Sequence, residues 1–331
     1  MTTIAVTGPT GTFGHGLIPL LQADPSVDRV VGIARRPFDP AEHGWTKMEY
    51  RRGDVRDRDA LAEAFAGADA VAHLAFNIYG NADRATLRAI NVDGTVNAFE
   101  AAAAAGVRRF VYASSVAAYG FHADNPIGMD EDHPIRGSRT LFYSQEKAEV
   151  EHLLREHAEA HPEVELTLFR PTIVLGPHAA GAGAEVVPGP LRPVARGLVG
   201  LLGALPVPFP MVPSPQPLQF VHEDDVGQAF LLALRGEGPP GPYNLAGDGT
   251  LTGEQLAREL GLAPLPVPGA VTRAGARAVT ALPSAVRPAA LDWAEAALHP
   301  LVVDSSRAKR ELGWSPRYTA VEALRATLAQ A

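Results

Sequence analysis

A glycine-rich turn near the amino terminus constrains the fold of this chain more than any other feature. The apolar run Ile4-Ala-Val6 predicts a strand, Gly8-Pro-Thr-Gly11-Thr-Phe-Gly14 follows it, and Phe13 to Leu21 can form a helix. In this order the first glycine permits a tight turn, the second lets the backbone approach a pyrophosphate, and the third lets the helix pack close to the strand. The N-terminus of the helix then faces the phosphates. The pattern predicts a dinucleotide site whose first residues are Gly8, Thr10, Gly11, Thr12, Phe13 and Gly14.

Short apolar runs alternate with helical patterns through the first half of the chain. Strands are predicted at Ile4–Val6, Arg29–Ile33, Met48–Arg51, Ala70–Leu74, Arg109–Ala113 and Leu166–Phe169, and helices at Leu61–Phe65, Ala89–Ala105 and Tyr143–Ala160. Apolar strands separated by helices indicate a parallel sheet that is covered on both faces. Right-handed crossovers then give a doubly wound sheet, so the sequence predicts an α/β protein of the Rossmann type.

The composition changes after Gly176, where proline, glycine and alanine become frequent. Prolines break strand ladders and helices, so the stretches 185–195 and 205–217 are expected to wrap a pocket in extended and short helical pieces. The alternative is a mobile linker, which the apolar content disfavours. We expect residues 1–175 to form an NAD(P)-binding Rossmann domain, sheet elements to return near 218–247, and residues 176–331 to form mainly a smaller C-terminal substrate-binding cap.

Composition and charge narrow the classes of function. The net charge is −8 and the arginine pairs at 35–36, 51–52 and 108–109 are isolated, so nucleic-acid binding has little support. The chain has no cysteine, which excludes thiolate catalysis, and no pair of histidines has a convincing metal-ligand spacing. The glycine turn begins too close to Met1 for a signal peptide, and prolines interrupt the longest apolar stretch, Gly197 to Val212. We therefore expect a cytoplasmic protein with a small-molecule partner, no metal and no binding to membranes.

Tyr143 and Lys147 are four residues apart, so on a helix both side chains project from one face. A free phenol titrates at about pH 10, so acid–base chemistry near neutrality requires the pKa of Tyr143 to fall, and a nearby ammonium group would lower it. The alternative is an amphipathic helix with a buried aromatic residue and an exposed lysine. Ser114 and Ser115 favour the catalytic interpretation, because they end a predicted strand at the edge where α/β sheets bind ligands. Ser115 would orient a carbonyl or alcohol beside Tyr143; as a nucleophile it lacks a Gly-x-Ser-x-Gly turn and a histidine base.

The end of the second predicted strand bears on the choice of cofactor. NAD-binding Rossmann proteins usually have an acidic residue there to bind the ribose hydroxyls, whereas this chain has Arg35 and Arg36. Two guanidinium groups match the charge and geometry of a 2′-phosphate, so we predict NADP, with NAD as the alternative. In that alternative the two arginines are solvated and backbone groups replace the acid. Asp54 is predicted to accept a hydrogen bond from the adenine amino group, and Asp57 to cap a helix that begins near Arg58.

With these residues in place, the chain resembles the extended short-chain dehydrogenase/reductase family, also called the NAD-dependent epimerase/dehydratase family. Further segments carry the resemblance along nearly the whole chain: His73-Leu-Ala75, Asn91-Val-Asp-Gly-Thr95, Arg170-Pro171 with Gly176-Pro177, Phe220-Val-His-Glu-Asp-Asp225-Val, Tyr243-Asn-Leu-Ala246 and Leu312-Gly-Trp-Ser-Pro316. The resemblance implies hydride exchange between a nicotinamide and an alcohol or carbonyl carbon. Tyr143 would be the acid or base, Lys147 would lower its pKa, and Ser115 would position the substrate oxygen.

The resemblance also implies further cofactor contacts and an assembly. Ala75 would lie against the cofactor ribose, Lys147 would bond the nicotinamide ribose, and Pro171 would lead a loop past the nicotinamide. A homodimer would pair the helices at 91–105 and 143–160 into a four-helix bundle. Beyond the glycine turn, the predicted cofactor contacts are Arg35, Arg36, Asp54, Val55, Leu74, Ala75, Phe76, Asn91, Ser114, Tyr143, Lys147, Pro171 and Ile173.

Two departures from the family pattern narrow the reaction. Dehydratases of the family carry an acid pair after the catalytic hydroxyl, but Val116-Ala-Ala118 follows Ser115, so dehydration is disfavoured. Nucleotide-sugar epimerases usually carry an arginine just before the Phe-Val-His segment to bind the diphosphate. This chain has Pro215-Gln-Pro-Leu-Gln-Phe220 there, which leaves Arg192 and Arg196 as candidate contacts. A pocket with so little positive charge suits an apolar carbonyl or alcohol, as in the branches that resemble dihydroflavonol reductases and 3β-hydroxysteroid dehydrogenases.

The sequence thus predicts an NAD(P)-dependent oxidoreductase that acts on a small hydrophobic ketone, aldehyde or secondary alcohol, with Ser115, Tyr143 and Lys147 as catalytic residues. A nucleotide-sugar epimerase is the alternative. A third hypothesis is a non-catalytic dinucleotide-binding sensor. The three proton-transfer residues argue against it, because a sensor needs the glycine turn but no proton relay.

Overall fold

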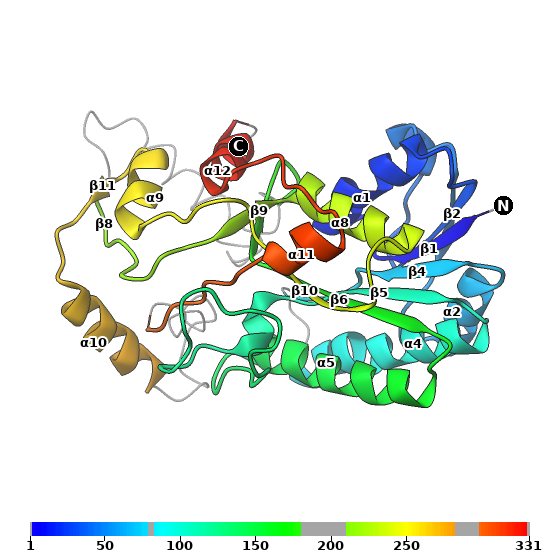
Figure 1. The fold of residues 1–331 in the computed structure, drawn as a ribbon, viewed down its shortest axis with the longest axis horizontal. Helices are drawn as coiled ribbons and strands as arrows, with labels where there is room; N and C mark the ends of the chain where they lie inside the picture. The colour runs from blue at the N-terminus through cyan, green and yellow to red at the C-terminus, as the bar shows by residue number, and fades with distance from the viewer. Residues whose placement is uncertain (1, 79–82, 180–209, 282–297, 330–331) are drawn as a thin grey trace.

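A parallel sheet organises the molecule. The computed structural model describes residues 2–78, 83–179, 210–281 and 298–329, and within them seven strands pair in the order β10-β6-β5-β4-β1-β2-β3 (Figure 1). These strands are β1 (Thr3–Thr7), β2 (Arg29–Ala34), β3 (Met48–Arg52), β4 (Ala70–His73), β5 (Arg109–Ala113), β6 (Glu165–Pro171) and β10 (Gly241–Leu245). Every pairing in the sheet is parallel. The predicted Rossmann-type doubly wound sheet is confirmed.

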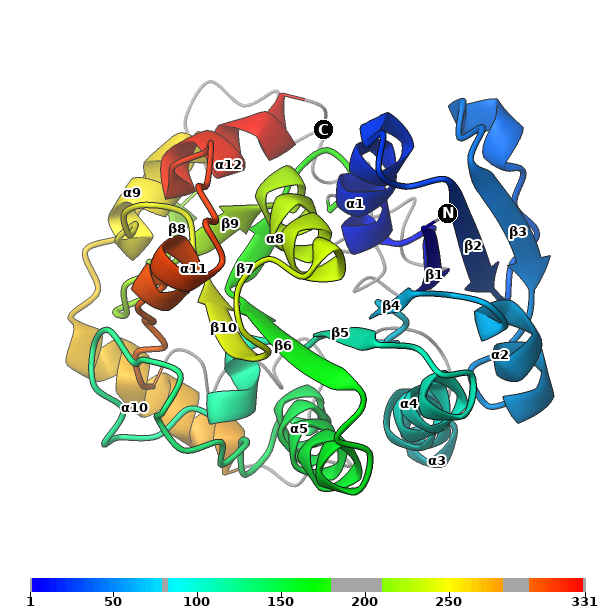
Figure 2. The ribbon, with the colours of Figure 1, turned by 45° about the vertical axis from the view of Figure 1, so that its right-hand side comes forward.

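Helices cover both faces of this sheet (Figure 2). One face carries α1 (Thr12–Ala23) and α8 (Glu223–Arg235), and the other carries α2 (Arg58–Phe65), α4 (Gly94–Ala104) and α5 (Phe142–Ala160). In β1, Ile4 and Val6 belong to the core beneath α1 and α8, whereas Ala5 belongs to the core beneath the other three helices. Burial on both faces explains why the strands are continuous apolar runs in the sequence.

The structure corrects the predicted helix at Ala89–Ala105. The helical stretch begins earlier, with α3 (Arg84–Arg88), and continues through a π-helical turn at Ala89–Asp93 before α4 begins. The π-helical turn places Asn91 in the interior, and such turns are frequent at functional sites. Asp57 caps α2 as predicted, because its carboxylate accepts two backbone N–H groups from the first turn of that helix.

The other described elements lie beyond the carboxyl edge of the sheet or beside β10, toward the left and top of Figure 1. Two pairs of short strands lie there, β7 (Ile173–Leu175) with β9 (Phe220–His222) and β8 (Pro210–Met211) with β11 (Ala263–Pro264). The helices in this region are α9 (Gly253–Glu259), α10 (Gly269–Thr280), α11 (Ser306–Glu311) and α12 (Ala320–Leu328). The stretch 185–195, the residues 205–209, Arg192 and Arg196 lie outside the described residues.

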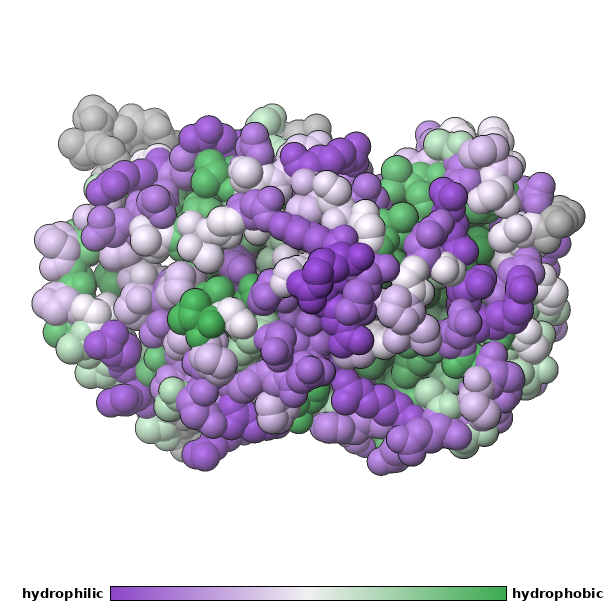
Figure 3. Space-filling model, in the orientation of Figure 1, coloured by the Kyte–Doolittle hydropathy of each residue, from purple (hydrophilic) through white to green (hydrophobic). Residues whose placement is uncertain are grey.

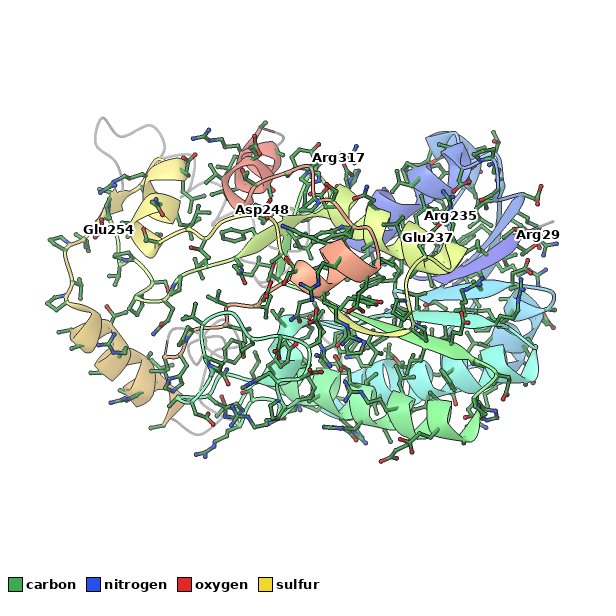
Figure 4. All side chains as sticks on the ribbon, viewed as in Figure 1. Arg29, Arg235, Glu237, Asp248, Glu254 and Arg317 are labelled. Atoms are coloured by element: carbon green, nitrogen blue, oxygen red, sulfur yellow. The ribbon has the colours of Figure 1, made fainter. Side chains whose placement is uncertain are left out.

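The visible surface is mostly hydrophilic, with apolar patches scattered across it (Figure 3). Exposed ion pairs lie at the amino edge of the sheet, where the Arg235 guanidinium is 3.9 Å from the Glu237 carboxylate (Figure 4). A cavity of about 300 Å³ opens at this edge, between Ile4, Arg109 and Arg235. It is at the opposite edge from the glycine turn and therefore does not belong to the candidate site. No helix in the described ranges combines the length and apolar composition that crossing a membrane requires.

Helices α1 and α8 cross at two glycines. A Cβ atom at Gly16 would lie 2.2 Å from the carbonyl oxygen of Glu223, and one at Gly227 would lie 2.2 Å from the carbonyl oxygen of Gly16. Gly14 was predicted to let the helix pack close to the strand. In the structure its close neighbour is instead the turn itself, because a Cβ atom at Gly14 would lie 1.9 Å from the carbonyl oxygen of Pro9. The close packing of α1 therefore depends on Gly16 and Gly227, and Gly14 keeps the turn tight.

Replacing Gly227 by alanine is predicted to destabilise the protein, because the added methyl group would meet the backbone of α1 rather than a flexible side chain. Overpacking of this kind costs about 1–3 kcal/mol. Gly275→Ala in α10 is the matched control, since a Cβ atom there meets no described atom within 4 Å, and alanine favours a helix interior by about 0.5–1 kcal/mol. Urea unfolding measures both free energies. A Gly227→Ala variant as stable as the wild type would contradict the close crossing.

Candidate active site

The glycine turn joins the carboxyl end of β1 to α1 and lies beside the residues that follow β4. Gly8 has a φ of +67°, and a Cβ atom there would lie 3.0 Å from the backbone nitrogen of Ala75 after β4. Gly11 is the N-cap of α1, which begins without a side-chain cap and without an acidic residue in its first turn. The first N–H groups of α1 and the positive end of its dipole are therefore available to an anion. The glycine turn and this helix start together suit a pyrophosphate. The other predicted residues of the turn are half-buried beside it: Thr10, Thr12 and Phe13.

Arginine side chains gather where β2 and β3 end. Arg35 and Arg36 follow β2 and are exposed, and Arg52 ends β3 in register with Ala34. The Arg52 guanidinium donates to the carbonyl oxygen of Arg35 at 3.0 Å, and the Tyr50 hydroxyl donates to the carbonyl oxygens of Ala34 and Arg36. These bonds hold the loop that carries the two predicted arginines. Sequence reasoning missed Arg52 as a third cation here, although its place at the end of the next strand was a usable signal.

Asp54, the predicted adenine contact, lies just after β3. Its carboxylate accepts from the Arg56 guanidinium at 2.8 and 3.0 Å and from the Arg56 backbone N–H at 3.0 Å. The hydrogen bonds from Arg56 hold the pKa of Asp54 below its usual value, against the opposing effect of burial. The ionised carboxylate still has lone pairs for a further donor. Val55 is buried against Gly94, so its side chain packs the interior.

A buried chain of hydrogen bonds runs from the end of β1 to the π-helical turn. Thr7 Oγ1 lies 2.9 Å from Nδ1 of His73, and Nε2 of His73 lies 3.0 Å from Oγ1 of Thr95. The Thr95 hydroxyl donates to the carbonyl oxygen of Asn91 at 2.6 Å, so His73 must donate from Nε2 and accept at Nδ1. Burial, helped by the charge of Lys147, lowers the pKa of His73 to about 3, which keeps this tautomer neutral. Thr7 Oγ1 also accepts from the first two N–H groups after β4, those of Leu74 and Ala75.

The Asn91 side chain clamps the loop after β4. It accepts from the N–H of Asn77 at 2.7 Å and donates to the carbonyl oxygen of Asn77 at 2.9 Å. The same amide donates to the buried carboxylate of Glu146 at 2.8 Å. These bonds fix the residue before Asn77, which is Phe76, against α5. Asn91 therefore shapes the predicted cofactor site through the loop that it holds.

Lys147 is enclosed beside this loop. Its ammonium group donates to the carbonyl oxygen of Ala113 at 2.6 Å and to the hydroxyl of Tyr112 at 3.1 Å. The same nitrogen lies 3.6 Å from the centroid of the Phe76 ring, and Tyr143 meets that ring edge-on with centroids 5.6 Å apart. Lys147 is only 2% exposed. The alternative of an exposed lysine on an amphipathic helix is therefore wrong.

Ser115 lies between two hydrogen bonds that dock α5 on the end of β5. Lys147 bonds Ala113, two residues before it, and the hydroxyl of Ser144 donates to the carbonyl oxygen of Ala117, two residues after it. The Ser115 oxygen accepts from the N–H of Ala117 at 3.1 Å, which leaves the hydroxyl proton for another acceptor. The three predicted catalytic residues thus share one corner of the carboxyl edge.

Ser114 points the other way. Its hydroxyl donates to a carboxylate oxygen of Glu151 at 2.6 Å, and Arg170 donates to the two oxygens of that carboxylate at 2.9 and 2.7 Å. Burial alone would raise the pKa of Glu151, but the charge and hydrogen bonds of Arg170 and the Ser114 hydroxyl together lower it. Neither Glu151 nor Arg170 has exposed side-chain surface. Because its hydroxyl is committed to Glu151, Ser114 would contact a cofactor chiefly through its main chain.

Two predicted contacts lie where the chain leaves the central sheet after β6. Pro171 ends β6 and is buried, and Ile173 begins β7 with 50% of its surface exposed. An exposed isoleucine at the carboxyl edge offers an apolar surface to a flat ring. Within the described residues, no three histidine, aspartate or glutamate side chains gather in a way that could hold a metal ion.

The model of the NAD dependent epimerase/dehydratase family matches residues 4–246, which include every predicted site residue. A UDP-glucose 4-epimerase of Erwinia amylovora is 32% identical over 248 residues, covering 70% of this chain and 73% of that protein. Sterol demethylase protein B of Methylococcus capsulatus is 34% identical over 182 residues, covering 54% of this chain and 52% of that protein. A solved short-chain dehydrogenase/reductase superfamily protein of Agrobacterium tumefaciens, with bound NAD, has a TM-score of 0.69 at 23% identity and covers 99% of this chain and 97% of its own.

Replacing Arg170 by methionine is predicted to cost about 3–5 kcal/mol of stability, because it leaves the Glu151 carboxylate buried without its partner. Arg155→Ala is the control: Arg155 reaches the same carboxylate at 3.3 Å but is 42% exposed, so its loss should cost about 1 kcal/mol or less. The deficit of Arg170→Met should shrink as the pH falls, because a protonated Glu151 needs no counter-charge. Urea unfolding at about pH 7 and about pH 5 measures this. Equal losses in the two variants would contradict the assignment.

Proposed function

The chain belongs to the NAD-dependent epimerase/dehydratase family, and from that premise we propose that it is a nicotinamide-dependent oxidoreductase. It would transfer hydride between the cofactor and the carbon of a ketone, an aldehyde or a secondary alcohol. The observation that carries the proposal is the placement of Ser115, Tyr143 and Lys147 at the edge where the glycine turn can hold a pyrophosphate. A dinucleotide sensor would need the turn but would have no use for an enclosed lysine, whose burial is energetically costly.

The residues of the carboxyl edge fit a dinucleotide. The positive φ of Gly8 and the uncapped start of α1 support pyrophosphate binding. The exposed Arg35, Arg36 and Arg52 support a 2′-phosphate and hence NADP, while the Agrobacterium structure contains NAD, which stays the alternative. When bound, the nicotinamide would supply or accept the hydride.

The chain's own side chains would manage the proton. Tyr143 would give its phenolic proton to the substrate oxygen in reduction and take a proton from it in oxidation. The charge of the Lys147 ammonium would stabilise the tyrosinate and so lower the pKa of Tyr143. The Ser115 hydroxyl, whose oxygen already accepts from Ala117, would donate its proton to the substrate oxygen and fix the direction of the carbonyl.

The described segment just before β9, residues 210–219, contains no lysine or arginine that could bind a diphosphate. Nucleotide-sugar epimerases of the family usually carry an arginine in this segment, where the chain has Gln216 and Gln219. Gln219 uses both ends of its amide on the backbone of Val303, at 3.0 and 2.8 Å, and Gln216 donates to the carbonyl oxygen of Leu298 at 3.0 Å. The exposed Ile173 and the similarity to sterol demethylase protein B also support a hydrophobic substrate. We therefore favour a small hydrophobic carbonyl or alcohol.

A nucleotide-sugar epimerase is the second candidate, supported by the 32% identity to the Erwinia UDP-glucose 4-epimerase over 70% of the chain. Tyr143 would then remove the proton and later return it to the same oxygen. Hydride would leave one face of the sugar carbon and return to the other, so the cofactor would show no net turnover. The two candidates therefore differ in a quantity that can be measured directly.

The assembly is also a proposal. The family resemblance implies a homodimer that pairs α4 and α5 with those of a second copy. On α5, Glu149 forms an ion pair with Arg88 at 2.5 and 2.6 Å, and the Glu149 side chain is 39% exposed. The first turns of α5 therefore present a polar surface near Arg88. A cytoplasmic location likewise stays a prediction.

The purified protein is expected to oxidise NADPH with hydrophobic ketones rather than to isomerise UDP- or dTDP-sugars. Absorbance of the reduced nicotinamide and chromatography of the sugars read both reactions in the same samples. Tyr143→Phe should lower turnover by about 10²-fold or more, because the proton donor is lost. Tyr318→Phe is the matched control, since the Tyr318 ring stacks on His222, away from α5. Isomerisation of a sugar nucleotide with retained cofactor would contradict the first candidate.

The arginines after β2 are expected to select NADP. The double variant Arg35→Ala, Arg36→Ala should weaken NADPH binding about tenfold or more and NADH binding only slightly, because the 2′-phosphate loses its charge-assisted hydrogen bonds. Fluorescence titration of each reduced cofactor gives both dissociation constants. Arg258→Ala in α9 removes an exposed arginine elsewhere and should change neither. Equal losses for NADPH and NADH would remove the reason for preferring NADP.

A further inference from the structure

Two buried acids flank Lys147 on α5. Glu146 precedes it and is 4% exposed, and Glu151 follows one turn later and is fully buried. A buried carboxylate is costly unless a cation or hydrogen-bond donors compensate its charge. The partners of each acid therefore indicate what it does for its neighbours.

Glu151 has its own counter-charges. Arg170 donates to both of its oxygens, Arg155 reaches it at 3.3 Å, and the Ser114 hydroxyl donates to it. The negative charge of Glu151 is therefore balanced inside this network, and the nearby positive charge of Arg170 opposes part of its effect on Lys147.

Glu146 has a different environment. The hydrogen bond that the described residues give it comes from a neutral group, the side-chain amide of Asn91. Arg88 acts on it only through space, because its guanidinium is bonded to both oxygens of Glu149. The buried cation next to Glu146 in the chain is Lys147.

We propose that Glu146 is a positioning residue of the active site, whose carboxylate keeps Lys147 in the ammonium form and, through Asn91, holds the loop that places Phe76 over that ammonium. The significance of this role rests on the function proposed for Lys147. The contacts form a closed ring: Glu146 and Lys147 are adjacent on α5, Phe76 and Asn77 are adjacent on the loop, and Asn91 joins Glu146 to Asn77. The Phe76 ring closes it at 3.6 Å from the lysine nitrogen.

The charge of Glu146 matters because Lys147 is enclosed. Burial lowers the pKa of Lys147 well below its usual value, and the charges of Glu151 and Glu146 act in the opposite direction. The other titratable groups that face the ammonium are Tyr112, Tyr143 and His73. Burial raises the pKa of Tyr112 well above its usual value and keeps His73 neutral, so neither supplies a negative charge. Without Glu146, a smaller fraction of Lys147 would carry the proton at a given pH, and a neutral lysine cannot stabilise the tyrosinate of Tyr143.

Lys147 can be observed directly, because the chain has three lysines, Lys47, Lys147 and Lys309. Protein labelled with ¹³C at the lysine Cε gives one resonance for each, and Lys147→Arg identifies the resonance of interest. Titration of that resonance in the cofactor-free protein reports the protonation of Lys147 whether or not a substrate is turned over. A failure of this inference is therefore distinguishable from a failure of the proposed function.

Glu146→Gln keeps an oxygen that can accept from Asn91 and removes the charge. It is expected to raise the acid dissociation constant of Lys147 tenfold or more, as the loss of a charge in a buried site requires. Glu149→Gln is the matched control, because it removes the same charge from α5 at a site that is 39% exposed, and it should change the constant less than about twofold. Glu146→Asp keeps the charge, should leave the titration close to that of the wild type, and preserves the test if the glutamine variant does not fold.

The pH profile of turnover gives a second readout. Its basic limb should move to lower pH in Glu146→Gln, because Lys147 then loses its proton earlier, and should stay in place in Glu149→Gln. An unchanged Lys147 resonance in Glu146→Gln, an equal change in Glu149→Gln, or a Glu146→Asp variant that titrates like Glu146→Gln would each overturn the proposal. Glu146 would then be only a hydrogen-bond acceptor for Asn91.

Discussion

The buried pair of Glu151 with Arg170 ties together the elements that build the active site. Arg170 comes from β6 and Glu151 from α5, and the hydroxyl of Ser114 brings the end of β5 to the same carboxylate. A buried ion pair often adds little net stability, because the loss of hydration of two charges offsets their attraction. Its contribution here is geometric, because only one orientation of α5 about its axis satisfies these hydrogen bonds. In that orientation Lys147 faces the end of β5.

The same constraint explains why α5 departs from an ordinary amphipathic helix. A helix on a sheet usually buries an apolar stripe, but the first half of α5 buries Glu146, Lys147 and Glu151. Apolar packing comes from Ala148, Val150 and Leu154, and the last two have no exposed surface. Up to Glu151 the buried face of the helix therefore mixes charged and apolar side chains. This arrangement lets the helix hold charged groups in the interior while its apolar side chains contribute to the free energy of docking.

Sequence reasoning recovered the sheet because strands buried on both faces leave continuous apolar runs. It recovered the glycine turn because Gly8 has a positive φ and Gly14 has no room for a Cβ atom. It could not tell whether the Tyr143 and Lys147 face points inward, since a four-residue spacing occurs equally on exposed helices. Ser114 and Ser115 show a related limit: neighbours in extended backbone point in opposite directions, so only one of the two hydroxyls could face a substrate. The partners that settle which one, Glu151 and Arg170, come from segments whose contact depends on the folded topology.

The distribution of charge along the carboxyl edge also separates the two candidate functions. Arginines cluster where β2 and β3 end, while the described segment before β9 presents glutamines whose amides are occupied by backbone groups. A diphosphate carries two negative charges and is usually met by guanidinium or ammonium groups. Positive charge therefore accumulates at the end of the site where a cofactor phosphate would bind, whereas residues 210–219, just before β9, carry none. An epimerase acting on a sugar diphosphate would have to draw that charge from another part of the chain, for which the sequence offers Arg192 and Arg196 as candidates.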